Sequence, residues 1–321
     1  MRNKPPGGPG RRADAPLRRR LGKVWKKLRA RLTRRWERLR GFPNLHRLFR
    51  AHHGCDLNLR APKTFNEKLQ YRKVFDRNPL YPIVSDKLRV RRYVARILGD
   101  EHAKAILPRL LGVSRWPSRR WIARLGDDVA IKANNASARN IFLRAGQTHD
   151  VAAITKTCRR WMRQDYGRRL QEWAYWPIPK RVIAEELLIG PDGRLADDIK
   201  FFMFDGLCAM IDVEWDRFGD HAQVFLDSDW TRLPVQMKQK RWIDAPPRPA
   251  GLAGMQEVAG RLSAGFDHMR VDFLYTGARF ALNELTVYSG SGLNSFRPEE
   301  WDRRLGDLWQ QRVQRGRGRT T

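Results

Sequence analysis

Two lysines stand in apolar runs where a free ammonium group would be costly. Lys200 lies between Ile199 and Phe201 in a run that continues with apolar residues, and Lys132 ends the apolar run that begins at Val129. A buried lysine usually has an anion beside it. For either lysine alone, a snorkelling surface position or an internal ion pair is the alternative. Because both lie on strands of expected hairpins, the two together favour a clamp that binds phosphate groups.

A second set of charged residues lies on two strands near the C-terminus. One strand carries Arg270 and Asp272, and the return strand carries Glu284. If Tyr275 pairs with Arg279 around a three-residue loop, Arg270 lies opposite Glu284, and Asp272 points to the same face. Two carboxylates on one face can hold a hard divalent cation, whereas an arginine–carboxylate network is the alternative. A one-residue slip would separate the carboxylates, so the prediction depends on the register.

Several other kinds of site are excluded by their missing motifs. The chain has no Walker A sequence, no dinucleotide fingerprint and no kinase catalytic loop. The seven histidines and three cysteines show no metal-ligand spacing. Ser137 and Ser289 have no evident His or Asp partners for a nucleophile. The run from Ser289 to Gly292 offers backbone N–H groups that can cradle an anion, although most such runs are turns.

The elements that must position these residues are mostly hairpins. Two short strands at 129–132 and 141–143 flank a polar loop at 134–140, and a third strand at 182–184 runs into Glu185. Two apolar runs between 197 and 213 are joined by Asp205-Gly206, a strong two-residue turn signal. Helical patterns cover most of 44–98, about 150–173 and 254–265. The pattern predicts an α+β protein with two lobes and mostly antiparallel sheets.

Composition and charge narrow the class of protein. The 321 residues are 41% hydrophobic, which is enough for a sizeable core, and the formal net charge is +30. No uncharged stretch of about 18 residues is present, so a membrane-spanning helix is not expected. No secretory signal is visible, and three widely spaced cysteines fit reduced thiols. We therefore expect a cytoplasmic protein.

Residues 1–40 hold a disproportionate share of the positive charge, with sixteen Lys or Arg against two acidic residues. Apolar residues recur every three or four positions from Leu21 to Leu39, which predicts a basic amphipathic helix. The helix can pack on the main domain, or residues 17–40 can dock on an anionic membrane at its inner face. Nucleic acid is the least supported partner, because no recognition motif accompanies the charge. Residues 310–321 form a shorter basic tail.

In their order along the chain, these residues resemble those of an ATP-grasp enzyme. More narrowly, the sequence is similar to the TupA-like ATP-grasp family of teichuronopeptide and cell-surface polysaccharide biosynthesis. The likeness covers roughly residues 65–309 and is specific at several separated sites. The stretches that carry it are 64–69 (TFNEKL), 76–80 (DRNPL), 85–87 (SDK), 200–202 (KFF), 290–292 (GSG) and 298–302 (PEEWD).

The resemblance implies a particular fold and division of the chain. We expect an α+β ATP-grasp fold in which two α+β lobes of mostly antiparallel sheet clamp a nucleotide. Residues 1–40 would form the basic arm and 41–115 a helical region before the lobes. The small lobe with the hinge would cover 116–190, the large lobe with the metal site 191–309, and the basic tail 310–321.

The resemblance also implies cofactors, ATP and Mg²⁺, and a role for each site residue. Lys132 and Lys200 would bind phosphates, and the loop containing Ser137 would close over them. Asp272 and Glu284 would hold magnesium, and Arg270 would stabilise charge in the transition state. On the nucleoside, Glu185 would accept from the adenine amino group, and Glu186 would also belong to the binding site. The backbone of Leu188 would contact the ring, and Asp192 would contact the ribose.

The implied reaction is carboxylate activation, in which ATP phosphorylates a carboxylate and an amine then displaces the phosphate. The carboxylate would belong to a glycan or glycan precursor. Two positions depart from the ATP-grasp pattern: the phosphate loop has no glycine, and Thr286 stands where a third metal ligand is usually Asn. A phosphotransferase on the same scaffold and a non-catalytic protein that binds membrane or nucleic acid through its basic arm are the alternatives.

Overall fold

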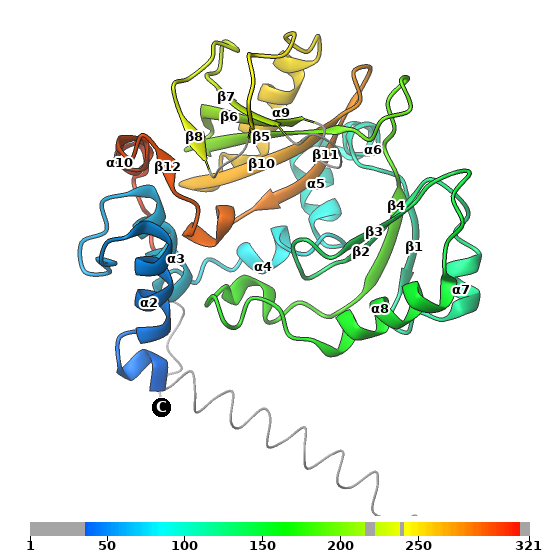
Figure 1. Ribbon diagram of the computed structural model, residues 1–321, viewed down its shortest axis with the longest axis horizontal. Helices are drawn as coiled ribbons and strands as arrows, with labels where there is room; N and C mark the ends of the chain where they lie inside the picture. The colour runs from blue at the N-terminus through cyan, green and yellow to red at the C-terminus, as the bar shows by residue number, and fades with distance from the viewer. Residues whose placement is uncertain (1–35, 216–221, 238–240, 315–321) are drawn as a thin grey trace, which may run out of the picture.

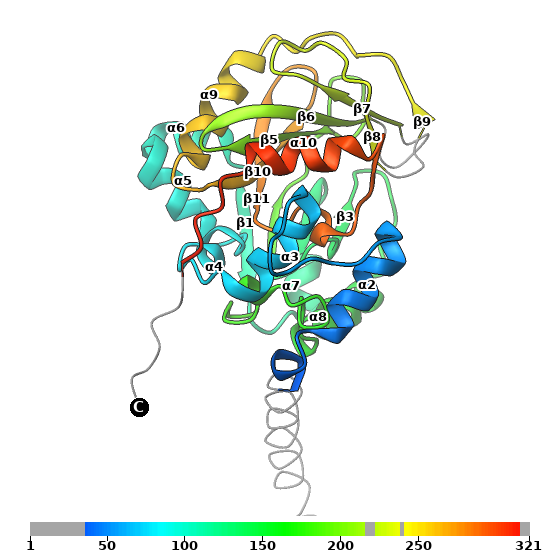
Figure 2. The same ribbon diagram turned by 90° about the vertical axis from the view of Figure 1, so that its left-hand side faces the viewer.

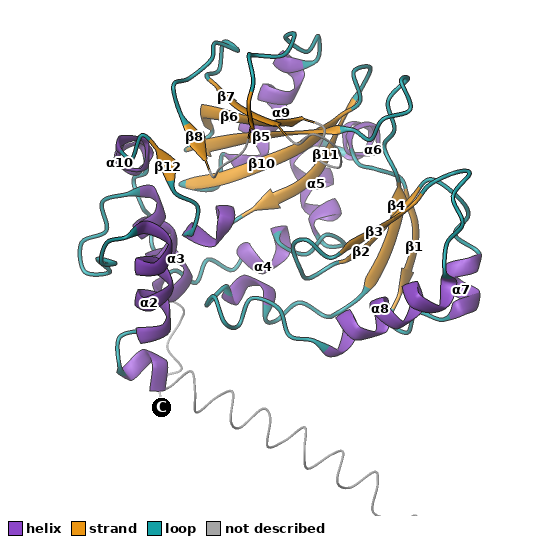
Figure 3. Ribbon diagram, in the orientation of Figure 1, coloured by secondary structure: helices purple, strands orange, loops and turns teal. Residues whose placement is uncertain are grey.

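The computed structural model of the protein describes residues 36–215, 222–237 and 241–314, and Figure 1 shows it with its element labels. Most of the predicted amphipathic helix at 17–40, and the end of the basic tail, lie outside these residues. Within them, two antiparallel-rich sheets carry helices on their outer faces, which confirms the predicted α+β class (Figure 3).

The larger sheet contains six strands in the order β11-β10-β5-β6-β7-β9. All neighbours are antiparallel except β7 and β9. The turn at Asp205-Gly206 joins β5 to β6, as predicted, and both residues adopt positive φ angles. The strands are β5 (Asp197–Phe204), β6 (Leu207–Trp215), β7 (Ala222–Leu226), β9 (Arg241–Trp242), β10 (His268–Tyr275) and β11 (Phe280–Thr286).

The smaller sheet has the order β1-β4-β2-β3, with β1 (Leu110–Ser114), β2 (Val129–Ala133), β3 (Asn140–Leu143) and β4 (Val182–Glu186). Helices α7 (Arg119–Ala123) and α8 (Val151–Arg163) pack their apolar sides on one of its faces. The helix predicted over 150–173 is therefore too long. The chain leaves the helical path where Lys180 pairs with Asp165 at 3.0 Å and Gly167 adopts a left-handed φ of 71°.

One face of the large sheet is an apolar core. Helices α5 (Val90–Leu98), α6 (Asp100–Ile106) and α9 (Leu252–Ser263) cover it. Side chains alternate along a strand, so Ile199, Phe201 and Met203 of β5 all point into this core, and the residues between them point the other way. The predicted helix over 254–265 corresponds to α9.

The opposite face of the large sheet is divided. At one end, Phe202, Phe204 and Met210 form an apolar cluster under α3 (Phe65–Phe75) and α10 (Glu300–Leu308). Figure 2 shows α10 lying across this sheet. The other end of the face carries charged residues and is turned toward the small sheet. The remaining elements are α2 (Pro43–His53), α4 (Tyr81–Val84), η1 (Trp173–Tyr175), η2 (Ser289–Gly292), β8 (Gln236–Met237) and β12 (Phe296–Arg297).

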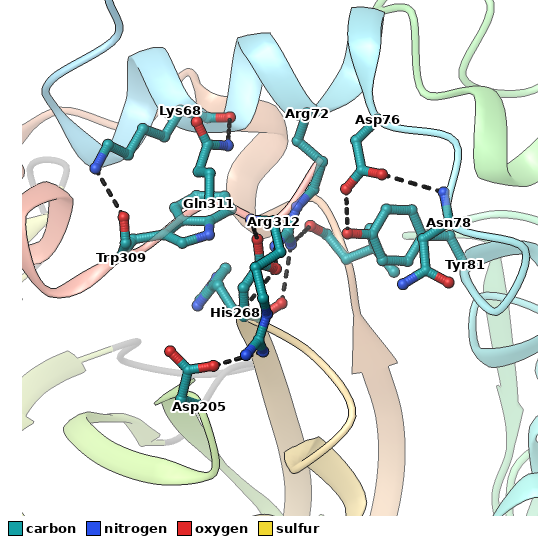
Figure 4. Close-up of polar contacts among 12 residues, drawn as sticks. Lys68, Arg72, Asp76, Asn78, Tyr81, Asp205, His268, Trp309, Gln311 and Arg312 are labelled. Carbon is teal, nitrogen blue, oxygen red and sulfur yellow. Dashed lines mark hydrogen bonds and ion pairs between the residues drawn. The ribbon is translucent and has the colours of Figure 1, made fainter. Parts of the chain in front are cut away.

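Helix α3 is held against the large sheet by a buried arginine (Figure 4). Arg72 is fully buried, pairs with Asp267 at 2.5 Å and donates to the carbonyl oxygens of His268 and Val287. The other oxygen of Asp267 accepts from the backbone N–H of Arg312 at 2.8 Å. Because a buried charge needs full pairing, this network ties α3, β10 and the chain after α10 into one unit. The first residues of the basic tail thus lie along the body.

Gly306 allows α10 to approach α3 closely, which gives a stability prediction. A Cβ atom at this position would lie 2.1 Å from the carbonyl oxygen of Lys63 and 2.9 Å from the backbone nitrogen of Phe65. Neither backbone atom can move independently, so Gly306→Ala should lower the free energy of unfolding by about 1–3 kcal/mol or more. Urea or thermal denaturation would measure the loss.

Gly254, a second helical glycine, is the matched control. Its Cβ atom would meet only the ring of Phe280, at an ordinary 3.5 Å. Gly254→Ala should therefore leave stability unchanged or raise it by up to about 1 kcal/mol, because alanine has the better helix propensity. Equal effects of the two substitutions would contradict the close packing of α10 on α3.

Candidate functional site

The charged end of the large sheet is a row of side chains on neighbouring strands. Asp272 on β10 pairs across the sheet with Glu284 on β11 and with Lys200 on β5, and Lys200 pairs in turn with Asp212 on β6. Directly opposite residues lie on the same face of a sheet. Antiparallel pairing therefore brings residues more than 80 positions apart into one row, in which two neighbouring carboxylates are followed by a lysine and a third carboxylate.

The predicted register of the β10–β11 hairpin is wrong, although Asp272 and Glu284 do lie on the same face, as predicted. Tyr275 pairs with Phe280 rather than with Arg279, so the loop holds four residues. The side chain of Thr276 accepts from the backbone N–H of Arg279 at 3.1 Å and stabilises this longer loop. An irregularity after Asp272 then shifts the register, so Asp272 lies opposite Glu284. Arg270 lies opposite Thr286 instead of Glu284.

Both carboxylates of this row are held by basic side chains. Arg270 donates two hydrogen bonds to Asp272, at 2.7 and 2.6 Å. Burial raises the pKa of Asp272 to about 6, although Arg270 opposes that shift. Lys87 lies 2.7 Å from Glu284. Burial would raise the pKa of Glu284, but Lys87 and Arg270 together hold it well below its usual range.

This donor set fits a magnesium ion that also binds phosphates. The hydroxyl of Thr286 lies 3.2 Å from Asp272 and 3.3 Å from Glu284, so three oxygen-bearing side chains converge. Among the described residues, no group of three or more His, Cys, Asp or Glu side chains could hold a metal by itself. Mg²⁺ typically takes one or two carboxylates and completes its shell with waters and substrate phosphates. Thr286 takes part in the cluster despite its departure from the family pattern.

The two predicted lysines are both buried, and both form internal ion pairs. Lys132 lies 3.0 Å from Glu185 and donates to the side chain of Asn283 at 3.3 Å. Lys200 lies 2.7 Å from Glu214 and 4.0 Å from Asp212. Burial would lower the pKa of Lys200, but the surrounding carboxylates outweigh it and raise the pKa. Lys200 therefore carries a full positive charge at neutral pH.

A cleft between the two sheets lies beside this row. Lys132 and Phe142 line it from the small sheet, and Asp198, Leu274 and Asn283 line it from the large sheet. The connection from Glu186 to Leu188 forms its end. Its walls are mostly apolar with a few polar groups, as is common in small-molecule sites. Of the residues predicted to bind the nucleotide, Lys132, Glu186 and Leu188 line this cleft.

The other predicted nucleotide contacts lie outside the cleft lining. Glu185 points to Lys132 and to Arg91, which lies 3.1 Å away. Lys200 belongs to the adjoining charged row. Asp192 is half exposed in a turn and pairs with Arg194 at 2.7 Å. Ser137 is exposed on the loop at 134–140. The structure thus brings together the lysines, Glu185 and the carboxylates, and it places Asp192 apart from them.

The stretch Ser85-Asp86-Lys87 connects two parts of the site, which the motif alone could not show. Lys87 pairs with Glu284, and its backbone N–H donates to the carbonyl oxygen of Asn134 at 3.0 Å. Asp86 accepts from the side chain of Asn134 at 2.8 Å. Asn134 begins the loop at 134–140, so one short stretch holds both this loop and the carboxylate of Glu284. The polar run Ser85-Asp86-Lys87 was the signal that the sequence itself offered.

The loop at 134–140 lacks glycine, yet it adopts a conformation that favours glycine. Ala138 has a φ of 55°, in the left-handed region where a Cβ atom is costly. Flanking contacts hold the loop, because the backbone N–H of Ala133 donates to the carbonyl oxygen of Arg139 at 3.0 Å. The loop therefore follows the backbone path typical of a glycine-containing loop, although it contains no glycine.

A second buried cluster adjoins the site where β11 ends. The run Ser289–Gly292 forms the short helix η2, with left-handed backbone at Gly290, Ser291 and Gly292. Lys73 on α3 donates to the carbonyl oxygen of Ser291 at 2.8 Å. Burial lowers the pKa of Lys73, and the neighbouring Glu172 opposes that shift. The glycine-rich run thus packs on α3 with a charged pair beneath it.

Comparisons with solved structures identify several ATP-grasp ligases with low identity. ATP-grasp ligase PsnB with its minimal precursor is 15% identical, at a TM-score of 0.34 over 70% of this chain and 54% of that chain. D-alanine–D-alanine ligase from Bacillus anthracis complexed with ATP is 13% identical, at 0.38 over 64% of this chain and 55% of that chain. The chain thus spans about half the length of these proteins. A comparison with curated proteins found no match.

The family comparison is more extensive. The TupA-like ATPgrasp family matches residues 67–310, which covers both sheets, the cleft between them and the charged row. The match agrees with the resemblance seen at the separate sequence stretches. The protein belongs to the TupA-like ATP-grasp family.

Proposed function

We propose that the protein is an ATP- and Mg²⁺-dependent ligase that joins a carboxylate to an amine through an acyl phosphate. The observation that carries the proposal is the row Glu284, Asp272 and Lys200 beside a cleft that Lys132 also lines. Two carboxylates and a lysine on adjacent strands, with a second lysine on the other sheet, can bind a metal ion and position the terminal phosphate of a nucleotide. Membership of the ATP-grasp family supports the same activity.

Each residue of the row has a role in this proposal. When bound, Mg²⁺ would neutralise phosphate charge and orient the phosphoryl group. Asp272 and Glu284 would hold it, while Lys132 and Lys200 would bind phosphate oxygens. Arg270 forms an ion pair with Asp272 and lies 4.0 Å from Glu284. In this position it would stabilise negative charge that develops in the transition state. Lys87 would join the phosphate-binding set once the metal takes over its contact with Glu284.

The apolar cleft would hold the adenine ring against Phe142 and Leu274, with the backbone at Glu186 and Leu188 available for hydrogen bonds. Glu185 would act mainly through Lys132, because its carboxylate points to that side chain. For Asp192 a ribose contact would require the turn to move. We therefore assign the nucleoside contacts mainly to the residues that line the cleft, rather than to every residue that the sequence motifs suggested.

We propose a carboxylate on a cell-surface glycan or its precursor as the acceptor, with an amine as the second substrate. The resemblance of the sequence stretches to a family of teichuronopeptide and cell-surface polysaccharide biosynthesis supports this substrate class. A phosphotransferase on the same scaffold would use a hydroxyl acceptor, and the charged row would serve it equally well. The two differ in the product rather than in the site.

Incubation of the protein with ATP, Mg²⁺, uronic-acid-containing glycans and amino acids tests the proposal. A ligase should form an amide and release ADP and phosphate together. Formation of a stable phosphoester would show a phosphotransferase instead. Glu284→Gln keeps the side chain's size and removes its charge, so this variant should fold and lose turnover by at least about 100-fold. Full activity in Glu284→Gln would contradict the proposed metal site.

We also propose a cytoplasmic location, with peripheral docking of residues 17–40 on the inner face of an anionic membrane. No helix among residues 36–215, 222–237 and 241–314 is both long and apolar enough to cross a bilayer. Support for docking is the basic amphipathic pattern of the arm itself. Binding of the arm to nucleic acid is the less favoured alternative.

Removal of the Lys200 charge should weaken ATP binding. Lys200→Met should raise the dissociation constant for Mg²⁺–ATP by about 10- to 100-fold, because one charge-assisted contact is lost. Calorimetry or equilibrium dialysis would measure it. The double variant Lys200→Met/Glu214→Gln also neutralises the carboxylate that lies 2.7 Å from Lys200, so folding should be preserved. Lys180→Met, which removes an ion pair with Asp165 outside the cleft lining, is the control and should bind normally.

The raised pKa of Asp272 predicts a pH effect on metal-dependent binding. This carboxyl group has a pKa of about 6, above its ordinary value, so it becomes neutral as the pH falls below about 6. A neutral carboxyl group is a poor magnesium ligand, so the Mg²⁺-dependent part of ATP affinity should fall about fivefold between pH 6 and 5, and about tenfold per pH unit at still lower pH. Asp272→Asn is the control, because any pH dependence that remains in this variant comes from the titration of ATP itself. If the variant showed the same Mg²⁺-dependent slope, Asp272 would not be a ligand.

A further inference from the structure

Charge is distributed unevenly between the two lobes. Residues 109–190 contain sixteen Lys or Arg and seven Asp or Glu, whereas residues 191–309 contain fourteen Lys or Arg and nineteen Asp or Glu. The region of the small sheet is therefore strongly basic, while the region of the large sheet is slightly acidic. Because one lobe carries most of this positive charge, its electrostatic field would attract an anionic partner to that lobe and orient the protein as it approaches.

Within the basic lobe, one face concentrates the exposed charges. This basic face consists of α7, the loop before it and α8, and residues 109–126 and 151–164 contain no acidic residue. Ile122, Ile154, Cys158 and Trp161 bury the inner sides of the two helices against the small sheet, so the basic side chains must point outward. The exposed basic residues are Arg115, Arg119, Arg120, Arg124, Lys156, Arg159, Arg160 and Arg163.

An exposed tryptophan lies on the same face. Trp116 is 86% exposed, between Arg115 and the buried Pro117. The side chain of Arg159 on α8 donates to the carbonyl oxygen of Pro117 at 2.9 Å, which fixes this loop beside α8. Val113, at the neighbouring edge strand β1, is 40% exposed. A large indole ring held in solvent among arginines indicates a contact surface, because tryptophan is enriched at membrane–water interfaces.

The basic face points away from the nucleotide cleft. Helices α7 and α8 cover the side of the small sheet opposite to the large sheet (Figures 1 and 2). The cleft is lined by the other side of the small sheet together with the large sheet. A partner on the basic face would thus leave the cleft open, and it would orient the cleft away from itself.

We propose that the basic face docks on an anionic membrane surface, with Trp116 inserted at the level of the lipid headgroups. Each basic residue near such a surface strengthens binding about fivefold, so eight of them form a substantial site. Among the described residues of this face, Trp116 is the only aromatic side chain that is mostly exposed. Single-stranded nucleic acid usually stacks on several aromatic side chains along a groove, so a membrane fits the face better. This surface is distinct from the arm at 17–40 and would set the orientation of the whole enzyme.

The test uses the full chain and vesicles of phosphatidylcholine with 0, about 15 or about 30% phosphatidylserine, an anionic lipid that attracts basic segments. The charge variant is Arg120→Glu/Arg160→Glu/Arg163→Glu, and the insertion variant is Trp116→Ala. We expect the charge variant to bind anionic vesicles at least about tenfold more weakly, and Trp116→Ala a few-fold more weakly. Binding should fall as salt rises, and ATP affinity should stay unchanged in both variants.

Matched controls come from the acidic half of the molecule. Arg248→Glu/Arg303→Glu/Arg304→Glu changes the net charge by the same amount, and all three residues are exposed. Leu207→Ala removes an apolar side chain that is 76% exposed and serves as the control for Trp116→Ala. Equal losses in the control and test variants would mean that net charge alone drives binding, which would overturn the proposed face.

Two further outcomes would also overturn the proposal. In the first, substitution of Arg29, Arg31, Arg34 and Arg35 by glutamine abolishes binding while the basic-face variants bind as the wild type does. The arm alone would then carry the interaction. In the second, the basic-face variants lose binding to a single-stranded oligonucleotide while their vesicle binding is unchanged. Additive losses from the arm and basic-face variants would support two separate contacts.

Discussion

The need to balance buried charge dominates the architecture of this protein. Lys200 and Asp272 lie in the middle of a six-stranded sheet, where an unpaired charge would be strongly destabilising. Pairing succeeds because the antiparallel register places opposite charges on neighbouring strands, and Arg270, Glu214 and Lys87 complete the network. A slip of one residue in any of these strands would move a charge into the apolar core on the other face. The register is therefore fixed by electrostatics as well as by packing.

The same requirement explains why the helical segment before the small sheet belongs to the site. Lys87, in the turn between α4 and α5, neutralises Glu284, and Asp86 holds the loop that starts at Asn134. Arg91 on α5 reaches Glu185, which in turn positions Lys132. These short polar connections link the loop at 134–140 of the small sheet to the carboxylates of the large sheet. Beside the cleft, these charge pairs thus link the two sheets.

A second network keeps the large sheet attached to the N-terminal helices. Arg72 crosses from α3 to the carbonyl oxygens of His268 and Val287 and to Asp267, and Trp309 lies over its guanidinium at 4.2 Å. The packing of Gly306 on the start of α3 and the bond from Lys68 to the carbonyl oxygen of Trp309 extend this contact. Because Lys73 and Gln70 of the same helix hold the run Ser289–Gly292, α3 connects the outer surface of the protein to the end of β11.

The amino-acid sequence by itself determined the family and singled out charged residues that need partners, because charged side chains in apolar strands cannot be left unpaired. It also predicted the β5–β6 hairpin, because Asp205-Gly206 strongly favours a tight turn between two strands. It could not determine the β10–β11 register, where a four-residue loop and an irregularity after Asp272 offset each other, nor the solvent position of Asp192. The contacts that Lys87, Arg91 and Asn134 make within the site were decided only by the tertiary structure. Their partners lie 48 to 197 residues away in the chain, and such pairings depend on how the sheets pack rather than on local propensity.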